Sequence, residues 1–198
     1  PKIAPLQVVI VPIFNKDAAA TEKINAKAHE LMQELRAKGI RVKFDNDDTK
    51  RPGWKFAEYE MQGVPVRIAL GARDIENNQA EVARRDTREK ESYSLDNIIA
   101  SVEQLLEDIQ MNMFHKALTF RNEHTTRVNS WDEFVAVLNE KTGFVAAHWD
   151  GTAETEDKIK EMTKATIRCI PLDNIKEEGS CVLTGKPSKQ RVLFAKAY

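Results

Sequence analysis

The chain has 198 residues, of which 41% are hydrophobic and 31% are charged. This composition supports a packed core and argues against global disorder. The 30 basic and 31 acidic residues give a formal net charge of −1. Any contact with nucleic acid therefore has to come from a local patch, because the chain has no global positive field.

Membrane and secretion signals are missing from the sequence. No apolar run approaches the roughly 18 residues that a membrane-spanning helix needs, and no signal-peptide pattern is present. The two cysteines, Cys169 and Cys181, form no CxxC pattern, which is typical of a reducing compartment. We expect a cytoplasmic protein without a membrane partner. Because the chain begins with Pro1 instead of Met, we also expect it to be part of a longer protein.

The first hundred residues predict alternating strands and helices. Residues 6–13 (LQVVIVPI) are rich in β-branched residues and predict a buried strand. Residues 18–38 have apolar side chains at spacings of three and four and predict a helix that Gly39 ends. The further elements are a strand at 40–44, a helix at 54–61, a strand at 64–70, and a hairpin of 79–85 with 88–93. This order predicts an α/β domain with a mixed sheet and packed helices.

A long helix is expected to link this domain to a second one. Ser94 is a suitable N-cap, and apolar residues continue in helical spacing through residues 95–121. We expect a first domain at 1–107 and a second at 122–198. The second has a helix starting at Ser130, further strands and one further helix, which predicts a small α+β domain. Its size is marginal for a core without support from a neighbour or a metal.

Catalytic motifs are absent from the sequence. The glycines form neither a phosphate-binding loop nor a GxSxG elbow, and the four histidines are isolated. We expect no catalytic residue in this chain.

One stretch places charge around an apolar strand: PGWKFAEYEMQGVPVRIALGARD, residues 52–74. The charged residues that can converge at one side of the sheet are Lys55, Glu60, Arg67, Arg73 and Lys90. They could form only a solvated rim with one ion pair, such as Glu60 with Arg67. They could instead recognise a base. A carboxylate accepts from the N1–H and N2–H donors of guanine, and an arginine donates to O6 and N7. Phe56 or Tyr59 could offer a stacking face to a base in a single-stranded loop.

The same stretch resembles the anticodon-binding domain of the prolyl-tRNA synthetases, which are class II aminoacyl-tRNA synthetases. The resemblance extends over essentially the whole chain in order. The other segments that carry it are APLQVVIVPI, GIRVKFDNDD, ALTFRNEHTTRVNSWDEF, ATIRCIPLD and GKPSKQRVLFAKAY. It implies an anticodon-binding domain and then a C-terminal domain that binds zinc in many relatives. The catalytic domain, which activates proline with ATP and Mg²⁺, would lie before Pro1.

The resemblance also implies roles for individual residues. Glu60 and Arg67 match the residues that read the guanines of a proline anticodon, and Arg73 and Lys90 match basic positions near the same loop. The family's PG-x-KF entry into the helix includes Lys55 and Phe56, and Tyr59 stands where relatives often have Trp. The family's C-terminal tyrosine, here Tyr198, would extend its carboxylate toward the catalytic domain. The implied partners are tRNA(Pro), that catalytic domain and a second copy of the full-length enzyme.

The zinc site departs from the family pattern. The positions that correspond to the four zinc cysteines of relatives are Asp150, Thr155, Cys181 and Thr184. His148 and Asp150 could join Cys181, but no fourth ligand is apparent, and a structural zinc needs about four. We therefore expect no zinc and no other cofactor in this chain.

Two functions remain open at the level of sequence. The chain is either the tRNA-reading part of a proline–tRNA ligase or a stand-alone RNA-binding accessory module that reuses the anticodon-binding fold. A class II catalytic domain in the reading frame upstream of Pro1 would decide for the first.

Overall fold

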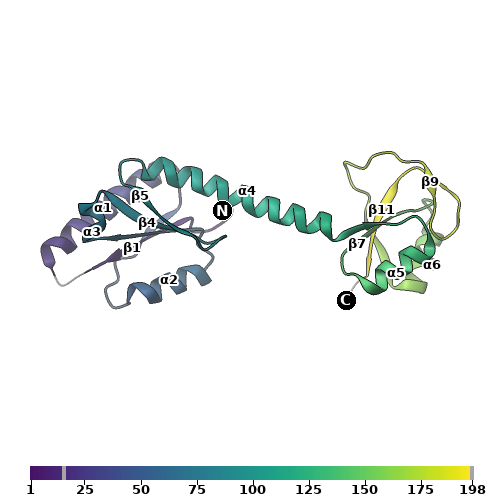
Figure 1. Ribbon diagram of the computed structural model, residues 1–198, viewed down its shortest axis with the longest axis horizontal. Helices are drawn as coiled ribbons and strands as arrows, with labels where there is room; N and C mark the ends of the chain where they lie inside the picture. The colour runs from purple at the N-terminus through teal and green to yellow at the C-terminus, as the bar shows by residue number, and fades with distance from the viewer. Residues whose placement is uncertain (15–16, 197–198) are drawn as a thin grey trace. The chain divides into compact units, whose positions relative to one another are not determined.

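The computed structural model describes residues 1–14 and 17–196, and the chain forms two compact units, residues 1–115 and 116–198. The division falls within the long helix α4 (Ile98–Glu123), between the expected domain ends at residues 107 and 122. Figure 1 shows that each unit has its own sheet and its own helices. Within the described ranges, no helix combines the length and apolar character that a membrane crossing requires.

Unit 1 contains a five-stranded mixed sheet, as the sequence predicts. Its elements are β1 (Val8–Ile13), α1 (Ala18–Ala37), β2 (Val42–Phe44), α2 (Pro52–Met61), β3 (Val66–Gly71), α3 (Ala72–Glu76), β4 (Gln79–Arg84), β5 (Lys90–Ser94) and α4. The strand order is β2-β1-β3-β4-β5. The first three strands are parallel, and β4 and β5 add an antiparallel hairpin to the edge beside β3.

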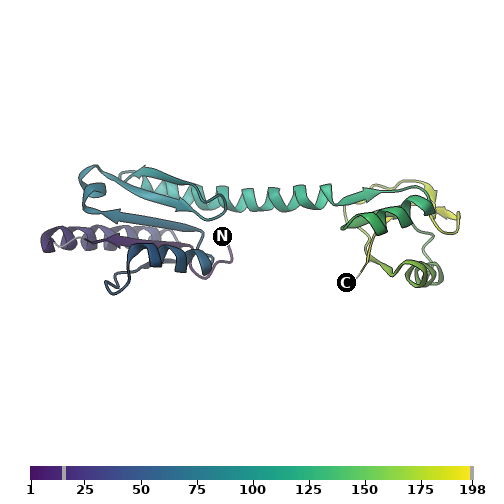
Figure 2. The ribbon, with the colours of Figure 1, turned by 60° about the horizontal axis from the view of Figure 1, so that its bottom comes forward.

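Helices cover both faces of this sheet (Figures 1 and 2). Alternate residues of a strand point to opposite faces, so Val8 and Ile10 face one way and Val9 and Val11 the other. The first pair packs in the main core with α1 and with the first turns of α4. The second pair packs with Tyr59 of α2 and with Val64. Among the described residues of unit 1, α2 is the one helix packed on this face, so part of the sheet beside it can form a site.

Two local expectations in unit 1 were wrong. The short helix α3 follows β3 directly, whereas the sequence predicted no element between the strand at 64–70 and the hairpin that starts at residue 79. The long helix begins at Ile98 rather than at residue 95, because Ser94 is still part of β5 and residues 95–97 form a turn. The Asp96 side chain in that turn accepts a hydrogen bond from Asn78 at 2.7 Å.

Unit 2 has a four-stranded sheet with two helices. Its elements are β6 (Thr125–Arg127), α5 (Trp131–Glu140), β7 (Phe144–His148), α6 (Ala153–Thr163), β8 (Ala165–Cys169), β9 (Gly179–Ser180), β10 (Pro187–Ser188) and β11 (Arg191–Lys196). The sheet order is β6-β7-β11-β8, and β9 pairs only with β10. Phe134 of α5 and Ile159 of α6 pack with Phe194 of β11 in a single core. The predicted cap at Ser130 is confirmed, since Ser130 and Glu133 bond reciprocally to each other's backbone N–H.

A polar cluster around the buried Arg191 holds the long segment between β8 and β11 against the sheet of unit 2. Arg191 is 8% exposed and donates to both carboxylate oxygens of Glu177, at 3.0 and 3.1 Å. The Arg191 guanidinium also donates to the backbone carbonyl oxygens of Val128 and Ala146. The pKa of Glu177 is lowered to about 2, chiefly by its hydrogen bonds with Arg191. This cluster connects four separate parts of the chain.

Candidate nucleic-acid interface

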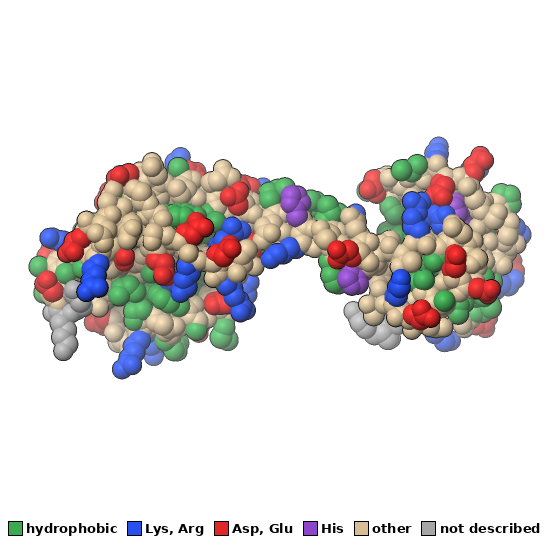
Figure 3. All heavy atoms as spheres, viewed as in Figure 1, with side chains coloured by type: hydrophobic (Ala, Val, Ile, Leu, Met, Phe, Trp, Pro, Cys, Tyr) green, Lys and Arg blue, Asp and Glu red, His purple; other side chains and the backbone are tan. Residues whose placement is uncertain are grey.

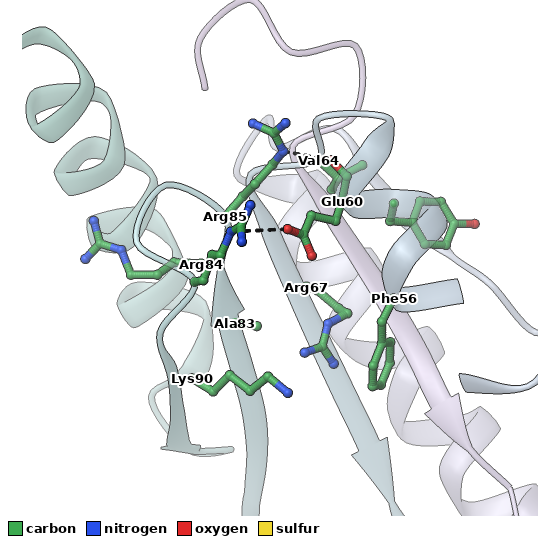
Figure 4. A pocket seen from close by; sticks show the side chains of 10 residues that line it. Phe56, Glu60, Val64, Arg67, Ala83, Arg84, Arg85 and Lys90 are labelled. Atoms are coloured by element: carbon green, nitrogen blue, oxygen red, sulfur yellow. Dashed lines mark hydrogen bonds and ion pairs between the residues drawn. The ribbon is translucent and has the colours of Figure 1, made fainter. Parts of the chain in front are cut away.

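A cavity of about 190 Å³ opens between α2 and the antiparallel edge of the unit 1 sheet (Figure 4). Its lining residues are Phe56, Tyr59, Glu60, Val64, Arg67, Ala83, Arg84, Arg85, Arg88 and Lys90. The lining combines an apolar wall from α2 with several cations from β3 and the β4–β5 hairpin. Glu60 of α2 adds a carboxylate to this lining.

Strand register places the two expected cations on one face of the sheet. Arg67 of β3 is directly opposite Ala83 of β4, and Ala83 is directly opposite Lys90 of β5. Residues in direct register point to the same face. The small side chain of Ala83 between the two long cations leaves the floor of the cavity open, and Figure 4 shows Arg67 and Lys90 on either side of it.

The Arg67 guanidinium contacts Glu81 and Phe56, and one of its nitrogen atoms has no partner among the described residues. The Arg67 side chain is 11% exposed, its Nη2 lies 3.1 Å from the Oε1 atom of Glu81, and its guanidinium carbon lies 3.5 Å from the centre of the Phe56 ring. Burial lowers the pKa of Arg67, and the charges of Glu81 and Glu60 oppose that effect. The Nη1 atom is buried and finds no hydrogen-bond partner within residues 1–14 and 17–196. A buried donor without an acceptor is costly, so a ligand that supplies one is favoured here.

Glu60 lies in the last turn of α2, where Gly63, with φ +79°, takes the left-handed conformation beyond the helix end. Its carboxylate is 3.5 Å from the Nε atom of Arg88, and its backbone carbonyl accepts from Arg85 at 2.8 Å. The ion pair between Glu60 and Arg67 that the sequence allowed is replaced by these contacts and by the pair of Arg67 with Glu81. Glu60 is half-exposed and remains accessible at the edge of the cavity.

Lys55 and Tyr59 are both buried, and of the two only Tyr59 is among the residues that line the cavity. Lys55 is 2% exposed, and its Nζ is 3.1 Å from a carboxylate oxygen of Asp45 and 2.9 Å from the Asp45 backbone oxygen. Tyr59 is 5% exposed and donates its hydroxyl to the other carboxylate oxygen of Asp45 at 2.8 Å. Tyr59 also packs with Val9 and Val11, so little of its ring is open to a base, and its role as a stacking face stays a prediction. Both side chains anchor α2 to the loop after β2.

The remaining predicted residues have different positions. Phe56 lines the cavity, but the guanidinium of Arg67 covers one face of its ring, so it supports Arg67 instead of standing free for a base. Arg73 is exposed on α3, beyond the end of β3, whereas Arg67 is near the start of that strand. A six-residue strand spans about 20 Å, so the structure does not bring Arg73 into the cavity. Tyr198 lies outside the described residues.

The hairpin adds residues that the sequence prediction missed. Arg84, Arg85 and Arg88 line the cavity together with Ala83. Their signal was the charged run RRDTREK, residues 84–90, which follows the alternating strand QAEVAR. Acidic and basic side chains are intermingled on the face of unit 1 seen in Figure 3, so the cluster is a local feature.

Asp86 fixes this hairpin. It accepts two hydrogen bonds from Arg84, at 2.7 and 2.8 Å, and one from Asn112 of α4 at 2.6 Å. The bonds from Arg84 are the main cause that lowers the pKa of Asp86 to about 2. The cations at the cavity therefore stand on a hairpin that is tied to the helix on the opposite face of the sheet.

Two family models match the chain. The one described as an anticodon-binding domain covers residues 7–105, and the one described as the C-terminal domain of prolyl-tRNA synthetase covers residues 131–198. The chain belongs to the prolyl-tRNA synthetase family. The cavity lies wholly within the part that matches the anticodon-binding domain.

Curated relatives agree with this assignment. A proline–tRNA ligase of Porphyromonas gingivalis is 60% identical over 198 residues, one of Phocaeicola vulgatus is 58% identical over 201, and one of Flavobacterium johnsoniae is 57% identical over 198. Each alignment covers 100% of this chain and 40% of the relative. The chain thus spans about two fifths of the length of the prolyl-tRNA synthetases that it matches.

Three of the four positions that correspond to zinc cysteines in prolyl-tRNA synthetases, Asp150, Thr155 and Thr184, form a hydrogen-bonded cluster with Thr152, and the fourth, Cys181, is a buried free thiol. One carboxylate oxygen of Asp150 accepts from the hydroxyl groups of Thr155 at 2.8 Å and Thr184 at 2.9 Å, and the other accepts from Thr152. Burial raises the pKa of Asp150, but these hydrogen bonds outweigh it and hold the pKa below its ordinary value. Within the described residues, no group of three or more His, Cys, Asp or Glu side chains could hold a metal ion. These donors do not fit a structural zinc, because hydroxyl groups already occupy the carboxylate.

We propose that Asp150 does by hydrogen bonding what a metal would do at these positions. Asp150→Ala is expected to lower the free energy of unfolding of unit 2 by about 1–2 kcal/mol, because three donors lose their acceptor near the protein surface. A chelator such as EDTA is expected to leave the melting temperature unchanged. Because the folded-state pKa of Asp150 is lowered, its contribution is present above the ordinary pKa of 3.8 and is lost as the pH falls below it.

Asp157→Ala is the matched control, since it removes the same charge from an exposed position on the neighbouring helix α6. Stoichiometric zinc in the purified protein, or a large drop in melting temperature on adding EDTA, would contradict the proposal. Equal effects of the Asp150 and Asp157 substitutions would show that only surface charge matters.

Proposed function

We propose that the cavity of unit 1 reads guanine in the anticodon of tRNA(Pro). The observation that carries this proposal is the buried, unpaired Nη1 atom of Arg67, with the Glu60 carboxylate at the rim of the same cavity. An arginine donates to guanine O6 and N7, while a carboxylate accepts from the N1–H and N2–H donors. An anticodon loop is single-stranded and exposes these edges for recognition.

The surrounding cations suit the RNA backbone rather than the base. Arg88 and Lys90 are exposed at the rim of the cavity. Exposed cations of this kind contact phosphates and strengthen binding without selecting a sequence. Lys90 thus has the phosphate-binding role that fits its position, and Glu60 and Arg67 carry the selectivity.

The larger protein that we infer is a proline–tRNA ligase. It would activate proline with ATP and Mg²⁺ in a catalytic domain outside this chain, act as a cytoplasmic homodimer, and use the present units to bind tRNA(Pro). The names of the curated relatives support this proposal over a stand-alone RNA-binding module. Within this chain we propose neither a catalytic residue nor a cofactor.

Removing either reading side chain is expected to reduce selective binding. Glu60→Ala and Arg67→Ala should each weaken binding to an RNA stem-loop with a GG-containing anticodon by about 1–3 kcal/mol, and should weaken binding to a loop with AA in place of GG much less. Equilibrium fluorescence anisotropy with labelled stem-loops measures both. Arg67→Lys keeps the charge but loses the planar fork, so it should lose selectivity as well.

Arg73→Ala is the matched control for Arg67→Ala, because it removes the same charge from an exposed position outside the cavity. We expect it to change binding to both loops little and equally. Losses of equal size for GG and AA loops after Glu60→Ala and Arg67→Ala would show that these residues contact only phosphate, and guanine reading would be disproved.

A further inference from the structure

Glu81 contacts both of the cations that flank the floor of the cavity. Its Oε1 atom lies 3.1 Å from Nη2 of Arg67 and 4.0 Å from Nζ of Lys90. Glu81 is on β4 two residues before Ala83, so it points to the same face of the sheet as Arg67. It is not among the residues that line the cavity. Its carboxylate therefore lies beside the cavity and engages the cations from there.

The contact with Glu81 restricts how the Arg67 guanidinium can turn. Phe56 covers one face of the guanidinium plane, and Glu81 holds Nη2 within that plane. A planar group that is held on its face and at one corner keeps the direction of its remaining donors. The remaining donor Nη1 is the one without a partner in the described part of the chain. Glu81 thus leaves Nη1 as the buried donor of Arg67 that still lacks an acceptor.

Glu81 also balances the charge of Arg67, whose side chain is 11% exposed. Without that carboxylate, Arg67 would be attracted toward the next nearest carboxylate, Glu60, whose charge already acts on it. Such a shift would pair the two reading residues with each other and would take both away from a base. The two carboxylates therefore have separate tasks: Glu60 faces the ligand, and Glu81 keeps Arg67 apart from Glu60.

We propose that Glu81 is a positioning residue for base recognition: it orients Arg67 so that Nη1 points to the O6 and N7 edge of guanine. This inference rests on the proposed function of the cavity. It assigns a role to a carboxylate whose negative charge would by itself repel RNA. Simple electrostatics predicts that its removal strengthens binding, whereas positioning predicts that its removal weakens binding.

The test measures the affinities of Glu81→Ala, Glu81→Gln and the wild-type chain for three RNA stem-loops. One loop carries GG, the second carries inosine at both positions and lacks the N2 amino group that Glu60 would accept from, and the third carries 7-deazaguanine and lacks N7. Glu81→Ala should weaken binding to the GG loop by about tenfold. The wild-type chain should bind the 7-deazaguanine loop more weakly than the GG loop, and Glu81→Ala should remove most of that difference, which is the penalty for 7-deazaguanine. The penalty for inosine should remain, because Glu60 is unchanged.

Glu81→Gln keeps an oxygen that can accept from Nη2 and is expected to restore part of the 7-deazaguanine penalty. Glu91→Ala is the matched control: Glu91 is an exposed carboxylate on the adjacent strand, and it faces the groove beside α4. We expect it to leave the ratio of the three affinities unchanged. Thermal unfolding of each variant shows whether the fold is kept.

The outcomes separate the two proposals. If the wild-type chain binds all three loops and an AA loop equally, guanine reading itself is disproved. If the wild-type chain discriminates and Glu81→Ala discriminates equally well, or binds the GG loop more tightly, Glu81 is not a positioning residue and guanine reading stands.

Discussion

Replacing Arg191 by alanine is expected to lower the free energy of unfolding of unit 2 by about 3–5 kcal/mol. The guanidinium is 8% exposed and is bonded to Glu177 and to the backbone carbonyls of Val128 and Ala146. Its removal leaves two backbone acceptors without their donor, and the segment around Glu177 loses its attachment to β11. A unit of this size has roughly 4–12 kcal/mol of stability in total, so the loss approaches complete unfolding.

Tryptophan fluorescence can follow unit 2 separately. The three tryptophans are Trp54 in unit 1 and Trp131 and Trp149 in unit 2. In a Trp54→Phe background, urea unfolding monitored by fluorescence therefore reports only on unit 2, where both remaining rings pack against the core. The measured quantity is the midpoint of that transition.

Arg127→Ala is the matched control for Arg191→Ala. Arg127 pairs with the same Glu177 carboxylate from a largely exposed position, so its loss should cost less than about 1 kcal/mol. Because the pKa of Glu177 is lowered to about 2, its contribution to stability is present above its ordinary pKa of 4.5 and is lost as the pH falls toward 2. In Arg191→Ala the pKa of Glu177 should lie closer to its ordinary value, so this acid-induced loss should be smaller. Equal midpoints for the two arginine variants would contradict a central role for Arg191.

Local sequence patterns predicted most elements of the fold. The β-branched run of β1 and the apolar spacing in α1 are periodic signals that tertiary contacts did not override. The cap at Ser130 was predicted because it depends only on residues three positions apart. By contrast, β6 has three residues and pairs with a strand that is distant in sequence, so nothing within Thr125–Arg127 indicates it.

The candidate site was predictable only in part. Glu60 and Arg67 were found through their residue types and through resemblance, and the structure places both at one cavity. Glu81 was missed because its role comes from register: it approaches Arg67 only when β4 pairs antiparallel with β3. Lys55 was predicted to contact RNA, but in the structure its side chain is buried. A lysine next to an aromatic residue suggests an RNA contact, and only the packing of α2 shows that the charge is buried against Asp45.

Replacing Lys55 by methionine is expected to destabilise unit 1 by about 3 kcal/mol. The methionine keeps the apolar stem that packs under α2, so the loss isolates the charge. Asp45, whose side chain is only 12% exposed, would keep the Tyr59 hydroxyl but lose its buried counter-ion. Burial raises the pKa of Asp45, and the hydrogen bonds from Tyr59 and Lys55 outweigh it and lower that pKa. The stability from this carboxylate is therefore present above its ordinary pKa of 3.8 and is lost as the pH falls below it, and in Lys55→Met this pH-dependent loss should be smaller because Lys55 no longer lowers the pKa.

The double variant Asp45→Asn with Lys55→Met distinguishes a buried pair from a simple packing defect. An asparagine still accepts from the Tyr59 hydroxyl and carries no charge, so the double variant should recover most of the loss. Thermal unfolding followed by circular dichroism measures the cycle, and anisotropy with the GG stem-loop follows the cavity. Because Lys55 and Tyr59 hold α2 through Asp45, Lys55→Met should also weaken guanine reading by Glu60, and the double variant should restore it. Additive effects of the two substitutions would show that the pair is not coupled, and unchanged RNA binding in Lys55→Met would show that the anchor of α2 does not position Glu60.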